Sequence, residues 1–198
     1  MTMAPPQRVA IMQPYLFPYL GYFQLAAAVD EFWLLDTVQF IQQGWMNRNT
    51  LRVNGTRTLF SIPVNKRPRI DAIGNKVYGP TAVHECNKLM KTLRIAYAKA
   101  PHVETAVAVV QGFARHLELT TQPPDFTTAT KAALQSCFDA IGLTTPIKRV
   151  SSLALDNTRT GQDRIIDACQ AIGAREYVNM IGGRDLYDAD DFTAAGLD

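Results

Sequence analysis

VAIMQPYLFPYLGYFQLAAAVDEFWLLD, residues 9–36, is the stretch that decides the fold class of this chain. Its first four residues are apolar and predict a short buried strand, which the prolines at positions 14 and 18 end in a shaped loop. Apolar residues then recur at helix spacing from Tyr19 to Val29, and FWLL at 32–35 predicts a second strand. A strand, a loop, a helix and a strand in this order form a βαβ unit, which favours a parallel sheet with a right-handed crossover.

The rest of the chain continues to alternate strands and helices, so the expected class is α/β with a mostly parallel sheet and flanking helices. Asn54-Gly55 predicts a tight hairpin turn, and Gly142 and Gly173 fit the ends of helices. We expect a single domain over 1–198, with a small hairpin and loop insertion at about 45–80 and a helical segment at about 81–141. Strands are expected at 49–53, 57–63, 147–151 and 176–179, with a further one allowed at 70–73, and helices at 81–98, 102–117, 125–141 and 160–172.

Composition limits the classes of function that the chain can have. It has 198 residues, 47% of them hydrophobic, and a net charge of +2 without a block of Lys and Arg, so nucleic acid is not an expected partner. The three cysteines are far apart and form no CxxC pair, and the three histidines are scattered, so we expect neither a metal site nor a disulfide framework. No signal peptide or membrane span is evident, and we expect a cytoplasmic protein of unpredicted oligomeric state.

The first candidate site lies in residues 13–23, between the first strand and its helix. Ligands of open parallel sheets bind at this position, against the free N–H groups of the helix. The tetrad Tyr19-Leu20-Gly21-Tyr22 matches in place the H-x-G-H signature of nucleotidyltransferases, with tyrosines where that signature has histidines, and this predicts a Rossmann-like, nucleotidyltransferase-like (HUP) start. Alternatively, the aromatic residues simply cap the core. The candidate binding residues are Gln13, Tyr15, Tyr19, Gly21 and Tyr22.

A second candidate site follows the second strand. Asp36 comes directly after that strand, and an amide-rich stretch with one arginine and one tryptophan extends to Asn49. Amides and an aromatic face suit a sugar, whereas an arginine suits a phosphate or carboxylate. An exposed polar loop is the alternative. The candidates here are Asp36, Gln39, Trp45, Asn47, Arg48 and Asn49, and Asn179 and Arg184 beyond the last strand are added to them.

Several uncommon strings, in a characteristic order, resemble the WbqC-like family. They are MQPYLFPYLGYF at 12–23, DTVQF at 36–40, GWMNRN at 44–49 and YAKAP at 97–101. The resemblance covers most of the chain and implies a role in modifying sugars, plausibly amino sugars, of bacterial surface polysaccharides. It adds Tyr97 and Lys99 to the candidate site. Members often continue with a further strand and tail, whereas this sequence ends at AAGLD; if that tail contributes to their site, this chain lacks the contribution.

Three functions are compatible with these observations. The first is a group-transfer enzyme that acts on a sugar or nucleotide-linked amino sugar, with amide formation as one reaction. Arg48 would hold the anionic part, Asp36 would act as general base, and Tyr19 and Tyr22 would orient the acceptor. The second is an adenylate-forming or nucleotidyl-transferring enzyme that binds ATP or CTP. The third is a non-catalytic binding protein. A small molecule is the expected partner, a nucleotide could be a cofactor, and the sequence indicates no metal.

Overall fold

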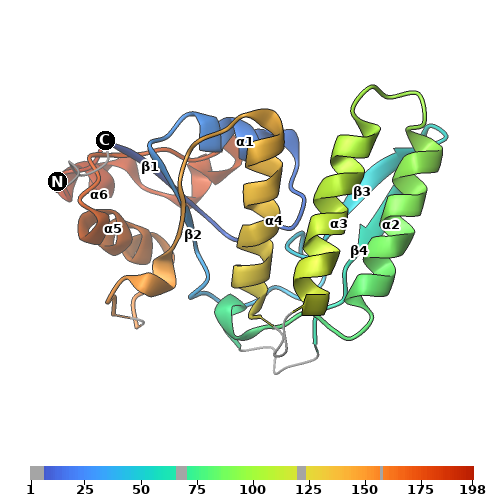
Figure 1. Ribbon diagram of the computed structural model, residues 1–198. Helices are drawn as coiled ribbons and strands as arrows, with labels where there is room; N and C mark the ends of the chain where they lie inside the picture. The colour runs from blue at the N-terminus through green and yellow to red at the C-terminus, as the bar shows by residue number, and fades with distance from the viewer. Residues whose placement is uncertain (1–6, 66–70, 120–123, 157) are drawn as a thin grey trace, which may run out of the picture. The chain divides into compact units, whose positions relative to one another are not determined.

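The computed structural model describes residues 7–65, 71–119, 124–156 and 158–198 (Figure 1). The chain divides into two compact units. Unit 1 consists of 1–13, 19–37 and 143–198, and unit 2 consists of 14–18 and 38–142. Both the predicted hairpin insertion and the predicted helical segment lie within unit 2, and the single domain stays a prediction.

Unit 1 contains a four-stranded sheet in the order β5-β2-β1-β6, and every pair of neighbouring strands is parallel. The helix α1 (Leu20–Ala27) connects β1 to β2, so the expected βαβ start and parallel sheet are confirmed. The order changes direction between β1 and β6, because β2 and β5 lie on one side of β1 and β6 lies on the other. The strands are β1 (Arg8–Met12), β2 (Glu31–Leu34), β5 (Ile147–Arg149) and β6 (Glu176–Tyr177).

One hydrophobic cluster of unit 1 joins one face of the sheet to α5 (Gly161–Ile172). Val9, Ile11 and Trp33 of the sheet pack with Ile165 of α5. The short helix α6 (Ala189–Ala194), which was not predicted, adds Phe192 to this core. Gly173 ends α5 in the left-handed conformation with φ 79°, as expected.

Two strands of unit 1 end earlier than predicted. The strand expected at 147–151 ends at residue 149, because the chain turns into η2 (Val150–Ser152), a 3-10 turn, where Asp36 accepts from the N–H of Ser151. The strand expected at 176–179 ends at Tyr177, before η3 (Ile181–Leu186), another 3-10 segment.

Unit 2 combines three helices, α2 (Ala82–Ala96), α3 (Val103–Leu119) and α4 (Phe126–Ile141), with an antiparallel hairpin of β3 (Arg48–Val53) and β4 (Thr56–Ser61). The hairpin turn is the predicted one, with positive φ at Asn54 and Gly55. Gly142 caps α4 in the left-handed conformation, as expected. In place of the strand allowed at 70–73, Ala72 forms an isolated bridge with Gln39 and a 3-10 turn, η1 (Ile73–Asn75), follows; residue 70 lies outside the described residues.

The core of unit 2 is rich in aromatic residues. The Tyr78 ring stacks on Phe126 at a centroid distance of 4.9 Å and meets Phe113 edge-on at 5.1 Å. Leu16 is completely buried in the same cluster, and Phe17 meets Phe113 edge-on at 5.7 Å. Residues 14–18 therefore belong to the core of unit 2, although the sequence places them between a strand and a helix of unit 1.

Candidate functional site

The two most distinctive stretches of the sequence are joined by hydrogen bonds within unit 2. The N–H of Leu16 donates to the carbonyl of Met46 at 2.7 Å. The Asn49 Nδ2 group donates to the carbonyl of Phe17 at 2.9 Å, and Phe17 has a left-handed backbone with φ 48°. A non-glycine residue in this conformation persists only where its surroundings fix it. The loop at 46–49 thus holds residues 14–18 in a defined, strained shape.

Both asparagines of this loop are engaged with backbone groups. Asn47 Nδ2 donates to the Ile62 carbonyl at 2.8 Å, and Asn49 Oδ1 accepts from the N–H of Thr50 at 2.8 Å. These contacts fix the two amide groups against the backbone, which limits how far they can turn toward a ligand. The geometry therefore favours positioning roles for Asn47 and Asn49 over the substrate binding expected from the sequence, and the latter stays a prediction.

Arg48 and Trp45 form the part of this loop that is best suited to a ligand. The Arg48 Cζ atom lies 5.5 Å from the centroid of the Trp45 ring, which is 50% exposed. The Arg48 Nε atom is buried and has no hydrogen-bond partner among the described residues. A buried donor without a partner costs about 1–3 kcal/mol, so a ligand oxygen would relieve this cost.

The remaining predicted residues of unit 2 are dispersed. The backbone of Gln39 bridges to Ala72, and the side chain of Tyr15 packs at the edge of the core. The hydroxyl of Tyr97 accepts from the N–H of Arg52 at 3.0 Å and so supports the hairpin. Lys99 is exposed. None of these contacts brings the four side chains to Arg48 and Trp45.

In unit 1, Asp36 follows β2 and its carboxylate is fully occupied. The side chain is buried and accepts from Arg149 Nε at 2.8 Å, Arg149 Nη2 at 2.7 Å, the Ser151 N–H at 2.9 Å and the Ser151 hydroxyl at 2.7 Å. A general base needs a lone pair that can reach substrate. These contacts favour a structural role for Asp36, which ties the exit of β2 to the exit of β5, and its role as a base stays a prediction.

The sequence did not identify Arg149 and Ser151 as partners of Asp36. The available signal was that both residues fall at the end of a predicted parallel strand, and the carboxyl ends of parallel strands share one edge of the sheet. Arg164, in the first turn of α5, was also missed; its Nη1 donates to the Thr37 carbonyl at 3.0 Å and its Nε to the Arg159 carbonyl at 2.8 Å.

The loop between β1 and α1 gives Tyr22 a structural setting. Tyr22 is completely buried, its ring lies 4.9 Å from that of Phe32, and its hydroxyl donates to the Gln13 carbonyl at 3.1 Å. A Cβ atom at Gly21 would lie 2.6 Å from Met180 Cε and 2.7 Å from Tyr19 Cε2. Side chains therefore cover the first turn of α1, where a nucleotide phosphate would have to approach.

The segment that follows β6 forms hydrogen bonds within itself. Asn179 Oδ1 accepts from the N–H of Met180 at 2.7 Å, and the N–H of Gly183 donates to the Met180 carbonyl at 2.8 Å. A side chain at Gly183 would collide with the amide of Asn179, so this glycine permits the close turn. Arg184 is exposed on the 3-10 segment η3. The predicted binding roles of Asn179 and Arg184 stay predictions.

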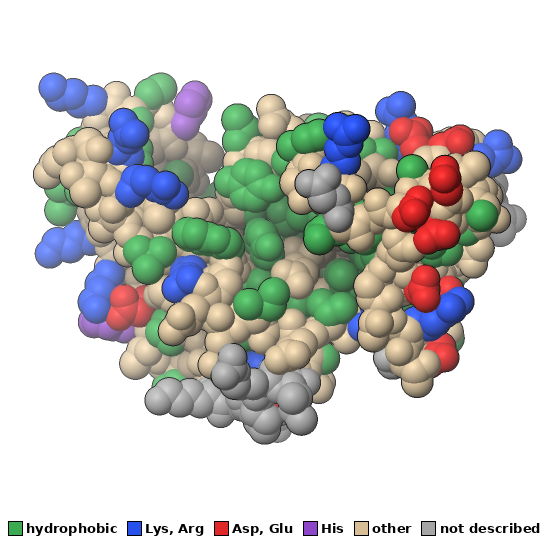
Figure 2. Space-filling view, turned by 180° about the vertical axis from the view of Figure 1, so that it is seen from behind, with side chains coloured by type: hydrophobic (Ala, Val, Ile, Leu, Met, Phe, Trp, Pro, Cys, Tyr) green, Lys and Arg blue, Asp and Glu red, His purple; other side chains and the backbone are tan. Residues whose placement is uncertain are grey.

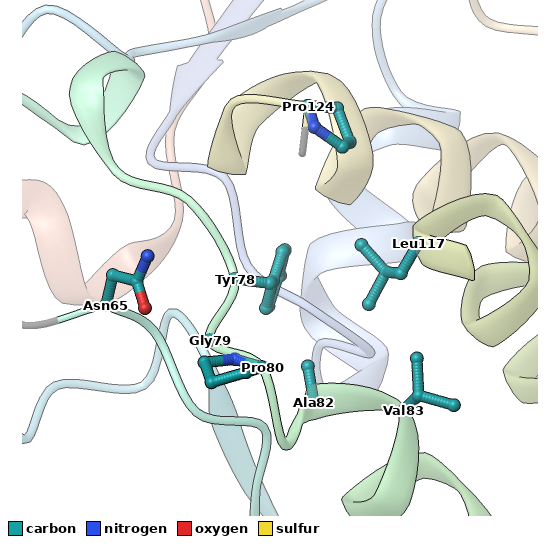
Figure 3. Close-up of a pocket in the computed structure, with 8 residues that line it drawn as sticks. All are labelled: Asn65, Tyr78, Gly79, Pro80, Ala82, Val83, Leu117 and Pro124. Atoms are coloured by element: carbon teal, nitrogen blue, oxygen red, sulfur yellow. The ribbon is translucent and has the colours of Figure 1, made fainter. Parts of the chain in front are cut away.

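A cavity of about 260 Å³ lies in unit 2 (Figure 3). Its lining is mostly apolar; Tyr78 is one of the lining residues, and its hydroxyl is hydrogen-bonded to the buried Thr130 Oγ1 at 2.8 Å. No predicted site residue lines it. The lining residues are Asn65, Tyr78, Gly79, Pro80, Ala82, Val83, Leu117 and Pro124.

Metal-binding clusters were expected to be absent from the sequence. In the described ranges 7–65, 71–119, 124–156 and 158–198, no group of three or more His, Cys, Asp or Glu side chains is arranged to hold a metal ion. Within the same ranges, no helix has the combination of length and apolarity needed to cross a membrane.

The three thiols are not activated nucleophiles. Burial raises the pKa of each to about 12, and the thiolate is the reactive form. We expect the native protein to react negligibly with Ellman's reagent at about pH 8, where about one thiol in ten thousand would be ionised. The urea-unfolded chain should release three equivalents rapidly. A thiol that reacts within seconds in the native protein would contradict this expectation. The cysteines are Cys86, Cys137 and Cys169.

The family model of the WbqC-like protein family matches residues 13–198, nearly the whole sequence, so this chain belongs to the WbqC-like protein family and the resemblance seen in the sequence is confirmed. The chain is similar to the uncharacterized protein Rv1507c of Mycobacterium tuberculosis (strain ATCC 25618 / H37Rv), at 25% identity over 183 residues that cover 92% of this chain and 76% of that protein. No solved structure matches the chain significantly.

Proposed function

We propose that this protein is a group-transfer enzyme of bacterial surface-glycan biosynthesis that acts on a sugar bearing an anionic group, such as a nucleotide-linked amino sugar, with amide formation as its reaction. The observation that carries the proposal is the Arg48 guanidinium, which lies over the exposed Trp45 ring with a buried, unmatched Nε donor. Membership of the WbqC-like family supports the choice of substrate class.

Two physical properties of this pair support the substrate class. A guanidinium presents a planar fork of donors that fits two oxygens of a phosphate or carboxylate. An exposed indole offers a broad, rigid apolar face, against which the C–H face of a sugar ring can pack. Arg48 would thus bind the anionic part of the substrate and Trp45 the sugar.

The other residues of the loop support Arg48 without contacting substrate. Asn47 and Asn49 fix the backbone on both sides of Arg48 through the Ile62 and Phe17 carbonyls. A fixed backbone reduces the entropy lost when the guanidinium engages a ligand. The main contribution of unit 2 to the reaction would be to position the substrate.

Substitution of Arg48 by alanine is expected to raise the Kd for the preferred nucleotide-linked sugar about 10- to 100-fold, the effect of losing one charge-assisted contact. Arg48→Lys keeps the positive charge but loses the planar donor fork of the guanidinium. Its Kd should therefore lie between that of the unmodified protein and that of Arg48→Ala. Isothermal titration with a panel of nucleotide-linked amino sugars and the corresponding free nucleotides measures both.

Arg115→Ala is the matched control, because Arg115 is an exposed arginine of the same unit, on α3. Its Kd should equal that of the unmodified protein. If no sugar of the panel binds, or if Arg48→Ala and Arg115→Ala bind equally well, the proposed function is wrong.

A second candidate, a non-catalytic ligand-binding protein, is favoured by the absence of an activated group at the described site residues. The carboxylate of Asp36 is occupied by Arg149 and Ser151, and the thiols have raised pKa values. Incubation with the bound sugar and acyl or aminoacyl donors, followed by mass spectrometry, separates the two candidates. Saturable binding without any new product would support the second.

A further inference from the structure

The hairpin of unit 2 has one face that its core covers and one that it does not. Leu51 of β3 and Phe60 of β4 pack against the hydrophobic core. Side chains alternate along a strand, so Arg52 and Leu59 project from the opposite face. Arg57 belongs to this face as well, since it pairs directly with Arg52. We call the face formed by Arg52, Arg57 and Leu59 the outer hairpin face.

The outer hairpin face holds two arginines whose Cα atoms are a directly opposed pair of the closely spaced kind. The N–H of Arg52 donates to the Tyr97 hydroxyl and not across the hairpin, which makes Arg52 and Arg57 a non-hydrogen-bonded pair. Residues in such a pair have Cα atoms about 4.5 Å apart, and like charges placed there repel. No carboxylate of the described residues forms an ion pair with either arginine. An external anion would remove this repulsion.

The charge of the chain is divided unequally between its two units. Residues 14–18 and 38–142 include 13 Lys and Arg against 6 Asp and Glu, a net charge of +7. The remaining residues, which make up unit 1, include 7 against 12, a net charge of −5. The modest net charge of the whole chain therefore conceals a strongly basic unit. In Figure 2, seen from behind α2 and α3, basic side chains lie among hydrophobic ones on unit 2, at the left of the view.

An exposed aliphatic side chain indicates which anion fits this face. Leu59 is 53% exposed and lies two residues from Arg57 on the same face of β4. A nucleic-acid backbone offers an aliphatic side chain no apolar partner, whereas the boundary between lipid headgroups and acyl chains does. Basic residues beside such a side chain are typical of proteins that lie on anionic membranes.

We propose that the outer hairpin face docks this protein on an anionic phospholipid surface. Arg52 and Arg57 bind headgroup phosphates, and Leu59 enters the boundary of the acyl chains. This contact is peripheral and depends on charge, so it weakens as ionic strength rises. It does not rest on the proposed function, because its contacts are Arg52, Arg57 and Leu59, although the alternation along β3 places Arg48 on the same side of the hairpin.

Co-sedimentation with vesicles tests the proposal. The full chain should bind vesicles of phosphatidylcholine mixed with phosphatidylglycerol and should not bind vesicles of phosphatidylcholine alone. Arg52→Ala/Arg57→Ala should lower the partition coefficient about 10- to 30-fold, from the loss of two charges near the surface. Leu59→Ser should lower it by about 3- to 10-fold, from the loss of apolar burial.

The charge-matched control is Lys91→Ala/Arg115→Ala, which removes two exposed basic residues from the helices α2 and α3 of the same unit. Its partition coefficient should stay within about twofold of the unmodified protein, because these residues lie off the outer hairpin face. Far-UV circular dichroism verifies that each variant is folded.

Three results would overturn the proposal. The first is that the unmodified protein does not bind the anionic vesicles. The second is that the two double variants lower the partition coefficient equally, which would show that binding depends on net charge alone. The third is that a single-stranded oligonucleotide displaces the protein from the vesicles, and that binding of the oligonucleotide requires Arg52 and Arg57 but not Leu59. That result would identify nucleic acid as the partner.

Discussion

Substitution of Asp36 by alanine should lower the free energy of unfolding of unit 1 by about 3–5 kcal/mol, the usual effect of removing one partner from a buried ion pair. The carboxylate is buried and accepts from Arg149 and Ser151. Without it, a guanidinium, a hydroxyl and a backbone N–H all lose their acceptor. The substitution also removes the side-chain link between the ends of β2 and β5.

Urea unfolding measures this loss, and the two tryptophans make the measurement specific. Trp33 is buried in unit 1, and Trp45 lies in unit 2, so Trp33 alone reports on unit 1 in a Trp45→Phe background. Asp190→Ala, at an exposed position of α6 in the same unit, should change stability by less than about 1 kcal/mol. Equal effects of the two substitutions would contradict the structural role of Asp36.

The second large effect is expected at Leu16, where alanine should destabilise unit 2 by about 2–5 kcal/mol. Leu16 is completely buried in the cluster that contains Phe113 and Phe126. Its truncation leaves a cavity and loosens residues 14–18, which are otherwise held by hydrogen bonds to Met46 and Asn49. Far-UV circular dichroism follows this unit well, because α2, α3 and α4 are the longest helices described.

Leu20→Ala provides a matched comparison. Leu20 lies four residues later in the same proline-rich stretch and is 71% exposed, so its truncation should change stability by less than about 0.5 kcal/mol. If both substitutions have the same effect, residues 14–18 are not part of the core of unit 2. The same Leu16 variant should bind the sugar more weakly, since the loop that carries Arg48 loses its support.

Local features of the fold were predictable because short-range chemistry determines them. The βαβ start follows from the apolar periods and prolines of residues 9–36, the hairpin turn from Asn54-Gly55, and two helix ends from glycines that adopt positive φ. Each of these signals lies within a few residues of the structure that it specifies. The family was also recognisable, since its strings are uncommon.

Contacts between distant residues were not predictable in this way. Asp36 and Arg149 are separated by 113 positions, so no local pattern connects them. Asn49 and Phe17 are 32 positions apart, and an amide-rich loop gives the same sequence signal whether its amides bind a sugar or the backbone. Leu16 follows a strand of unit 1 in the sequence, but its side chain is buried in the core of unit 2. The exposed indole of Trp45 and the guanidinium of Arg48 are among the predicted groups whose described contacts remain compatible with ligand binding.

The interleaving of the two units along the chain has a consequence for biosynthesis. All residues of unit 2 lie before residue 143, whereas β5 and β6 of unit 1 lie at 147–149 and 176–177. A chain that emerges from the ribosome therefore presents a complete unit 2 while β1 and β2, which pair with each other, still lack their outer neighbours β6 and β5. Since domains fold as their residues become available, the helical unit should form first. The apolar strands β1 and β2 would remain exposed until the last fifty or so residues are made, and that interval is when this protein is most in need of a chaperone.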